Sequence, residues 1–421
     1  MKLMGNNMLG YLYLIIFFIF SCAICETSPF SFVSMGDIEP SMQNSTGIAN
    51  ADSLIINNQN YATWSKLANA TFSISFSQYL HNIEKTEGSS KRSSDYDRFT
   101  FEDLSFAFPF GKNNFFGISY YPLSIVDMTN VFEKEAENID AERLIRTLET
   151  RKGSISNASL IYGKAFGTLS LSSNISFKFG NYDTTTRYNV IGYEGGEEDW
   201  ENTHEKRQTD QISHVSAGGG FLYGSPFGID LGAEISVPVN SYGYRFKEFD
   251  RTDTTGRILE TIYSDEYELK DIEWPMEFGL GFSYGKKHFL LSYDYRHKNF
   301  KGINTGLDET ELTNYFRHTA GIKFAPGKRV YDPYYKRMSY SGIFTIEKRP
   351  FEYEENPVYD VTGSLGLDFP FNNKMTDIGL IISYTRSGSI SKNGLEGNTV
   401  KFQFNFISSD NWWLKKEKYN D

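Results

Sequence analysis

Apolar and polar residues alternate along the last part of the chain, residues 375–406. In two stretches separated by a turn-rich run at 387–394, every second position is apolar or aromatic, and the positions between are mostly small, polar or charged. The apolar positions are Ile378, Leu380, Ile382, Tyr384, Val400, Phe402, Phe404 and Phe406. A period of two indicates β-strands, because successive side chains of a strand point to opposite faces. The continuous apolar face is either the inside of a soluble sandwich or the lipid-facing outside of a membrane barrel.

The same alternation recurs upstream, which brings the predicted number of strands to about fourteen. The upstream stretches begin near Ala70, Leu104, Phe116, Ala158, Leu169, Val215, Ile229, Met276, Phe289, Phe316, Met338 and Val361. In the first half of this array, short connections rich in Gly, Pro, Lys and Asn alternate with long acidic ones, such as 133–152, 193–210 and 246–271. Short periplasmic turns alternating with longer outer loops are typical of outer-membrane barrels, and an even strand number returns both termini to the periplasm. The pattern predicts an all-β, transmembrane antiparallel β-barrel over residues 69–408, with a periplasmic tail at 409–421.

The first 25 residues have the parts of a secretory signal peptide. Lys2 precedes an apolar run at 8–20, which is followed by small residues, Cys22 and Cys25. A spanning helix needs ~20 apolar residues, so this run fits a signal better than a membrane anchor. We expect residues 1–25 to be removed on export, with a lipoprotein-type cut before Cys22 as the alternative. Cleavage after Cys25 leaves a mature chain without cysteine, and therefore without a disulfide or a cysteine metal site.

Composition agrees with export to the outer membrane of a Gram-negative-type bacterium. Only 39% of residues are hydrophobic, but 16% are aromatic, with 35 Phe and 28 Tyr. That composition suits strands that alternate between lipid and lumen. The formal net charge is −11, and loss of Lys2 with the signal makes it −12. This balance argues against nucleic acid as a partner, because proteins that bind it are usually basic.

Residues 26–68 precede the first clear strand and are predicted to form a plug, or hatch, inside the barrel. A fourteen-strand lumen is too wide for its own side chains to fill, since eight strands are about the limit. The lumen is therefore either an open pore or filled by another segment. The aromatic and aliphatic content of 26–68 favours a packed segment over a flexible exported leader, which is the alternative. The candidate plug residues are Phe30, Phe32, Asn60, Tyr61, Ala62 and Trp64.

Charged residues occur at positions that the alternation directs into the lumen. They are Asp230, Glu234, Glu277, Asp294, Arg296, Arg317, Lys323 and Lys401. One interpretation is a substrate path or an ion-selective lining. The other is that a barrel lumen is polar in any case, so that these charges pair with one another or with the plug. We favour the second interpretation for any single residue.

The chain also resembles the long-chain fatty acid outer-membrane transporter (FadL) superfamily, in a divergent branch. The resemblance rests on the strand number, on the stretch from Met35-Gly36-Asp37 to Asn60-Tyr61-Ala62-Thr63, and on the closing segment 386–416. In the family the second motif usually reads Asn-Pro-Ala, and Tyr61 stands here in place of the proline. The resemblance implies passive uptake of hydrophobic molecules. In that family outer loops capture the ligand, a hatch occludes the lumen, and a lateral opening in the wall releases the ligand toward the membrane.

Residue patterns for other chemistries are weak. The six histidines do not have the spacing of metal ligands, and no cofactor is expected. The run Ala217-Gly218-Gly219-Gly220 lies within a predicted strand and lacks the Lys-Ser/Thr that follows a phosphate-binding loop. It predicts a close backbone approach within the barrel wall. No nucleophile elbow occurs between a strand and a helix, so we do not expect an enzyme.

Two functions remain. The first is an outer-membrane channel for passive uptake of hydrophobic small molecules such as long-chain fatty acids. For this function, an approximate helical stripe in residues 130–152 would be a capture surface or a helix packed on the barrel rim. The alternative is a structural or secretion-associated barrel that recruits a protein partner at its rim. Both functions place the barrel wall against outer-membrane lipid.

Overall fold

The computed structural model describes residues 47–410, except 53–54, 88–89, 112, 136–142, 195–196, 254, 271, 304–311, 328–331, 354–355, 372–375 and 394. Its helical segments are short: the 3-10 helix η1 (Tyr61–Lys66), α2 (Tyr334–Arg337) and α3 (Ile390–Asn393). Among these described residues, no helix is long and apolar enough to cross a membrane. The architecture is therefore set by strands.

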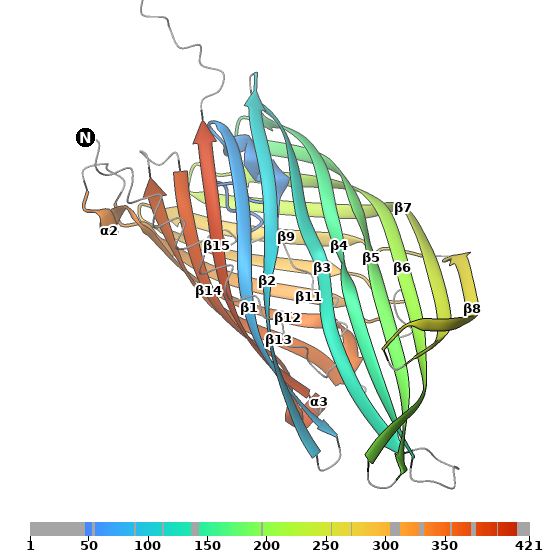
Figure 1. Ribbon diagram of the computed structural model, residues 1–421. Helices are drawn as coiled ribbons and strands as arrows, with labels where there is room; N and C mark the ends of the chain where they lie inside the picture. Colours follow the sequence, from blue (N-terminus) through green and yellow to red (C-terminus); the bar gives the residue numbers. More distant parts are fainter. Residues whose placement is uncertain are drawn as a thin grey trace, which may run out of the picture.

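Fourteen antiparallel strands close into a barrel (Figure 1). They are β1 (Ala70–Glu87), β2 (Ser90–Phe110), β3 (Asn114–Glu135), β4 (Arg143–Phe166), β5 (Leu169–Glu194), β6 (Glu197–Gly224), β7 (Ile229–Thr252), β9 (Glu277–Lys286), β10 (Phe289–Lys298), β11 (Tyr315–Phe324), β12 (Ser339–Tyr353), β13 (Asn356–Phe371), β14 (Thr376–Ser389) and β15 (Leu395–Asp410). The ring closes because β1 pairs with both β2 and β15, and β7 pairs with both β6 and β9. One further strand, β8 (Ile258–Glu268), lies outside the ring and pairs with β7. The predicted barrel of about fourteen strands is confirmed.

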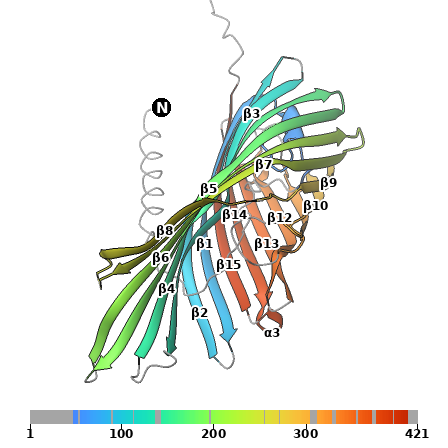
Figure 2. The same cartoon turned by 90° about the vertical axis from the view of Figure 1, so that its right-hand side faces the viewer.

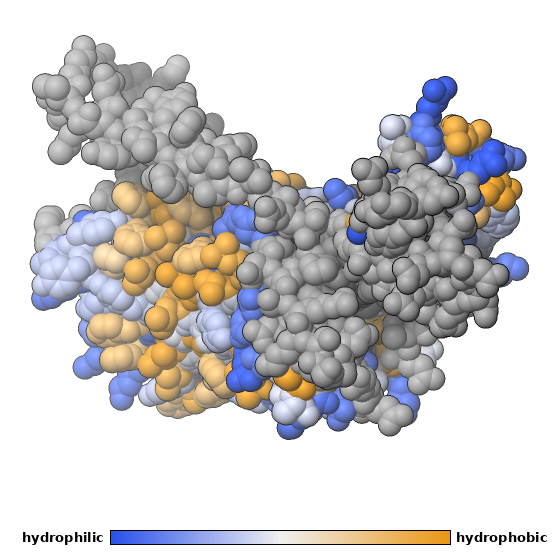
Figure 3. All heavy atoms as spheres, turned by 60° about the horizontal axis from the view of Figure 1, so that its bottom comes forward, coloured by the Kyte–Doolittle hydropathy of each residue, from blue (hydrophilic) through white to orange (hydrophobic). Residues whose placement is uncertain are grey.

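The outer wall of the barrel is apolar and its inner wall is polar, as the alternation predicts. Along β14, Leu380, Ile382 and Tyr384 are exposed on the outside, whereas Ile381 and Ser383 are buried toward the lumen. Figure 3 shows apolar side chains as orange patches over the outer wall. A surface of this kind is stable in lipid, where exposed apolar side chains need no protein partner.

Several strands are much longer than a membrane requires. A transmembrane strand needs about 9–11 residues. The strands β4, β5, β6 and β7 have 24, 26, 28 and 24 residues. Their parts farthest from the turns at 167–168 and 225–228 run on past the barrel as a twisted sheet, which is seen at the lower left of Figure 2. We call this sheet the outer wing; it comprises residues 143–155, 181–194, 197–212, 241–252 and β8.

Two expectations from the sequence about the residues of the outer wing are wrong. The acidic segments 133–152, 193–210 and 246–271 were expected to be long loops, but most of each segment is strand. The helical stripe expected in 130–152 is wrong as well, because β3 continues to Glu135 and β4 starts at Arg143. Beyond the membrane neither face of a strand has to be apolar, so alternation is lost. Pairing with neighbouring strands still satisfies the backbone hydrogen-bonding groups.

Both ends of the barrel chain lie at the end of the barrel opposite the outer wing. Ala70, the first residue of β1, pairs with Asp410, the last residue of β15. An even number of strands places both termini on one side of the membrane, and the sequence-based expectation is that this side is the periplasm. The outer wing then projects from the cell surface.

Candidate functional site: the plugged lumen

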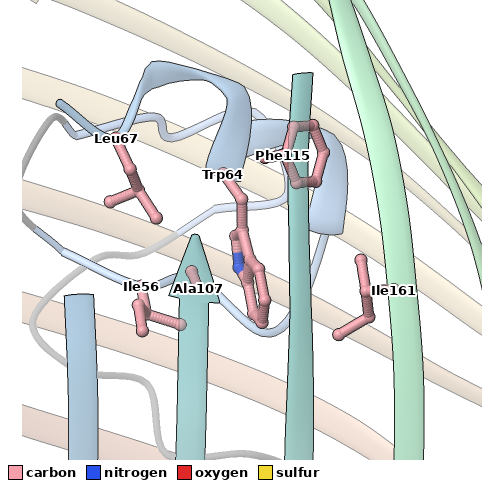
Figure 4. Close-up of a cluster of buried hydrophobic side chains, with 6 residues drawn as sticks. All are labelled: Ile56, Trp64, Leu67, Ala107, Phe115 and Ile161. Carbon is pink, nitrogen blue, oxygen red and sulfur yellow. The ribbon is translucent and has the colours of Figure 1, made fainter. Parts of the chain in front are cut away.

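Residues 47–52 and 55–69 lie against the inner wall of the barrel and are called the plug below. An apolar cluster holds one side of it. In Figure 4, Trp64 points from η1 between the wall strands, with Ile56 and Leu67 of the plug around it. The wall contributes Ala107 of β2, Phe115 of β3 and Ile161 of β4. Trp64 has no exposed surface, so this cluster seals the plug against β2–β4.

The local fold of the plug depends on Asn60 and on the indole of Trp64. The Asn60 side chain caps η1 by accepting a hydrogen bond from the Ala62 amide at 3.1 Å. Its Nδ2 donates to the carbonyl oxygens of Ile48 and of Phe221 in β6, both at 2.9 Å. The indole Nε1 of Trp64 donates to the Asn57 carbonyl at 2.8 Å. One side chain, Asn60, therefore ties together the cap of η1, the start of the plug and the wall.

Polar contacts attach the plug to strands on opposite sides of the lumen. On one side, the Tyr61 hydroxyl lies 2.9 Å from Ser119 Oγ of β3. Close by, Asn58 Nδ2 donates to Asp103 Oδ1 of β2 at 2.5 Å. On the other side, the Ile48 amide donates to Asp294 Oδ1 of β10 at 2.7 Å. The plug thus spans the lumen from β2 and β3 to β10.

Glycines in the wall make room for the plug. A Cβ on Gly232 of β7 would lie 2.5 Å from the carbonyl oxygen of Ile48. On Gly117 of β3 it would overlap the indole of Trp64. In the predicted glycine run, a Cβ on Gly220 would overlap Asn60 Oδ1. The sequence predicted a close approach within the wall for this run, whereas at Gly220 the plug itself lies against the wall.

Most of the predicted lumen charges lie in ion pairs with other wall residues. Lys178 Nζ of β5 and Lys298 Nζ of β10 lie 3.0 and 3.6 Å from the two carboxylate oxygens of Glu277. Arg296 pairs with Glu234. Two further predicted charges, Lys323 and Lys401, pair with Asp368 at 3.3 Å and with Glu102 at 3.1 Å. These contacts agree with the interpretation that the lumen charges pair with one another.

The remaining three predicted charges are Asp230, Asp294 and Arg317, whose surroundings differ from those ion pairs. Asp294 is bound to the plug, as described above. Arg317 of β11 is buried in register with Arg296 of β10. Asp230 lies beside Gly224 and Lys66, where a Cβ on that glycine would be 3.1 Å from Asp230 Oδ1 and 4.0 Å from Lys66 Nζ.

Sequence reasoning missed several partners in this lumen, notably Glu102, Asp103, Lys178, Lys298 and Asp368. Lys178 carried a usable signal, since it lies between Phe177 and Phe179 in an alternating strand. Of the candidate plug residues, the structure places Asn60, Ala62 and Trp64 inside the barrel as buried residues and Tyr61 as a partly buried one. Phe30 and Phe32 lie outside the described residues.

A small polar cavity remains beside the plug. Its volume is ≈ 80 Å³. The lining includes Asn58, Tyr61 and Tyr121 together with the ion-paired residues Lys178 and Glu277. Sites for drug-sized ligands usually enclose about 300–1,000 Å³ and are mostly apolar. The cavity fits a few water molecules better than an acyl chain.

The barrel wall has a seam between β2 and β3. The two strands pair from Leu104 and Tyr120 to Phe110 and Asn114 and diverge toward the outer wing, as Figure 1 shows. Each strand carries a bulge beside the seam, at Glu102 and at Leu123 respectively. Across the gap, Arg98 Nη1 of β2 donates to the Ile125 carbonyl of β3 at 3.0 Å. The Arg98 side chain thus bridges two strands beyond the point where their backbone pairing ends.

Comparisons with known proteins bear on this architecture. A family model described as BamG matches residues 4–420. A search of curated proteins finds no match. Among solved structures, the Pseudomonas putida toluene transporter TodX is similar, with a TM-score of 0.58 and 10% identity, over 86% of this chain and 99% of that one. A Pseudomonas aeruginosa FadL homologue has a TM-score of 0.53 and 10% identity, over 85% of this chain and 96% of that one. At such identity these likenesses show the fold.

Proposed function

The chain belongs to the BamG family, and from this premise we propose that it is a plugged outer-membrane barrel that recruits a protein partner at its cell-surface end. The observation that carries the proposal is the outer wing. Its strands exceed the length that a membrane needs by more than a factor of two in β5 and β6. Passage across the membrane does not require this extension, whereas a docking platform needs folded surface beyond the lipid.

The polar lumen supports the same proposal. Residues of the plug form hydrogen bonds with β2, β3, β6 and β10, and the lining of the ≈ 80 Å³ cavity beside the plug includes charged and amide side chains. A buried ion pair such as Lys178 with Glu277 is costly to break, because loss of one partner leaves an unpaired charge. A hydrophobic solute in this lumen would have to displace such contacts.

A second candidate function is passive uptake of hydrophobic small molecules, with long-chain fatty acids as the expected class. The seam between β2 and β3 favours it, because it offers a lateral route from the lumen to the lipid near the plug. The likeness of the fold to a toluene transporter and to a FadL homologue agrees with this candidate. If the chain takes up hydrophobic molecules, the hydrogen bond of Arg98 across the seam would have to break and the plug would have to move.

Two measurements on the full chain separate these functions. First, outer membranes containing the tagged chain at its natural level are solubilised in mild detergent, and the complex is purified. We expect a stoichiometric partner that in turn retrieves this chain when the partner is tagged. Second, purified chain in liposomes should admit a fluorescent long-chain fatty acid no faster than liposomes without protein. Faster entry by the protein-containing liposomes, with a chain that purifies alone, would favour the channel.

A further inference from the structure

β8 is an edge strand at the cell-surface end of the molecule. Within the part of the chain that the structure describes, it ends the strand order of the sheet and pairs with β7 on one side. β7 pairs with β9 along Ile229–Ser236 and with β8 along Tyr244–Thr252. β8 thus takes the place of β9 where the outer wing leaves the membrane, and all of its residues are exposed.

The register of β8 shows which backbone groups face the free edge. The Leu269 amide, directly after β8, donates to the Gly243 carbonyl of β7 at 2.8 Å. Hydrogen-bonded and non-hydrogen-bonded pairs alternate along an antiparallel ladder. The outward N–H and C=O groups are therefore those of Ser264, Glu266 and Glu268. Bulges at Leu259 and Ile262 interrupt the earlier part of β8, so its regular edge runs from Tyr263 to Glu268.

The side chains of β8 protect this edge only in part. Native edge strands are commonly blocked by charged residues, above all Lys, by Pro, by bulges or by a covering segment, and the bulges of β8 lie before Tyr263. β8 has neither Lys nor Pro, and Tyr263 is 48% exposed and Tyr267 36% exposed. Its charged residues are all acidic: Glu260, Asp265, Glu266 and Glu268. The edge combines outward backbone groups, exposed aromatic rings and acidic side chains, of which Glu260 pairs with Arg251 of β7 at 3.3 Å.

We propose that the Tyr263–Glu268 edge of β8 accepts an extended, Lys- or Arg-bearing segment of a partner protein as an added β-strand. In this mode main-chain hydrogen bonds supply affinity and alternate side chains supply specificity. A second copy of this chain fits the edge poorly, because β8 against β8 would place acidic residues beside acidic residues. The basic segment would instead neutralise Asp265, Glu266 and Glu268. This inference rests on the proposed function and names its docking surface.

In vivo photo-crosslinking tests the docking surface. Tyr263 is replaced with a photoreactive benzoyl-phenylalanine in the full chain, and the control places the same group at Leu365, an exposed position on the lipid face. After irradiation of intact cells, the crosslinked peptide is sequenced by mass spectrometry. We expect one discrete adduct from Tyr263 with a basic, strand-forming segment of another protein, and no such adduct from Leu365.

Two variants show whether the backbone edge is used. Glu266→Pro removes one outward N–H and leaves the β7–β8 ladder intact, so the adduct should be lost. Glu266→Gln keeps that N–H and removes one charge, so the adduct should weaken and remain. Heat-modifiable migration on gels verifies that both barrels are folded. An adduct that survives Glu266→Pro, or that joins two copies of this chain, overturns the inference.

The result also separates this inference from the proposed function. If the Tyr263 adduct is absent but a stoichiometric partner still purifies with the chain, docking occurs elsewhere and the partner-recruiting function stands. If neither the adduct nor the partner is found, both are wrong.

Discussion

At the scale of single residues, wall glycines decide how closely the plug can pack. Gly117 faces the Trp64 indole, whereas Gly363 of β13 has no atom within 4 Å of the position a Cβ would take. We predict that Gly117→Val displaces Trp64 and destabilises the barrel by about 1–3 kcal/mol through overpacking. Gly363→Val, the same change at an open wall position, should cost much less. Urea unfolding followed by gel migration measures both, and equal costs would argue against the packing of Trp64 on β3.

The lipid face allows a second prediction at this scale. Leu380 is 41% exposed on the outer wall, within the apolar alternation of β14. Leu380→Arg should destabilise the barrel by ~2–4 kcal/mol, because a cation near the bilayer midplane loses its hydration. Leu380→Phe keeps the position apolar and serves as the control. Refolding into lipid vesicles at graded urea concentrations gives both free energies. An arginine tolerated as well as phenylalanine would mean that Leu380 does not face lipid.

The sequence predicted the direction of single side chains better than their partners. Alternation placed Glu234, Glu277 and Lys401 toward the lumen, where they lie in ion pairs. The partner of Lys401 is Glu102, which occupies a bulge of β2. A bulge inserts one residue and shifts the alternation by one, so a strict period of two misplaces that residue. Pairing across the lumen joins residues far apart in the chain, and no local pattern encodes it.

At the scale of elements, the sequence located every membrane-crossing strand but not its outer end. The apolar alternation that reveals a strand exists only where one face meets lipid. Residues 181–194 and 197–212 are strand without that alternation, and their acidic, polar composition is typical of loops. The plug was predicted from lumen width and from the aromatic content of 26–68. Its contact with Asp294 agrees with the expectation that lumen charges pair with one another or with the plug, whereas its contact with Asp103 was not predicted.

Removal of the plug should change the ion conductance of the barrel. We predict that deletion of residues 47–66 leaves an inserted barrel, because the strand ladder does not pass through the plug. Water then fills a polar lumen of this width, and ions follow. Planar bilayer recordings should show small steps or none for the full chain and large, steady conductance for the deletion. Heat-modifiable migration confirms folding. Equal conductance of the two forms would show that residues 47–66 do not close the lumen.

At the scale of the whole molecule, successive levels along the barrel axis have different roles. These levels are the lipid face with the closed lumen inside it, and the outer wing. The apolar band holds the protein in the membrane, and the plug fills its centre. The outer wing lies beyond the lipid, and its strand β8 is exposed along its length. This division requires that the wing end of the barrel face the cell exterior.

The strand β7 provides a direct test of that orientation, because its two ends should lie on opposite sides of the membrane. Its 24 residues span about 80 Å when extended, against about 30 Å of hydrocarbon. Phe227 is 82% exposed in the turn before β7, and Thr255 is exposed in the connection after it. The native cysteines, Cys22 and Cys25, lie in the predicted signal peptide, and Cys22→Ser with Cys25→Ser makes a single introduced thiol unique. On intact cells, a membrane-impermeant maleimide should label Thr255→Cys at once and Phe227→Cys only after the outer membrane is permeabilised. The reverse order would place the outer wing in the periplasm, and any partner of β8 with it.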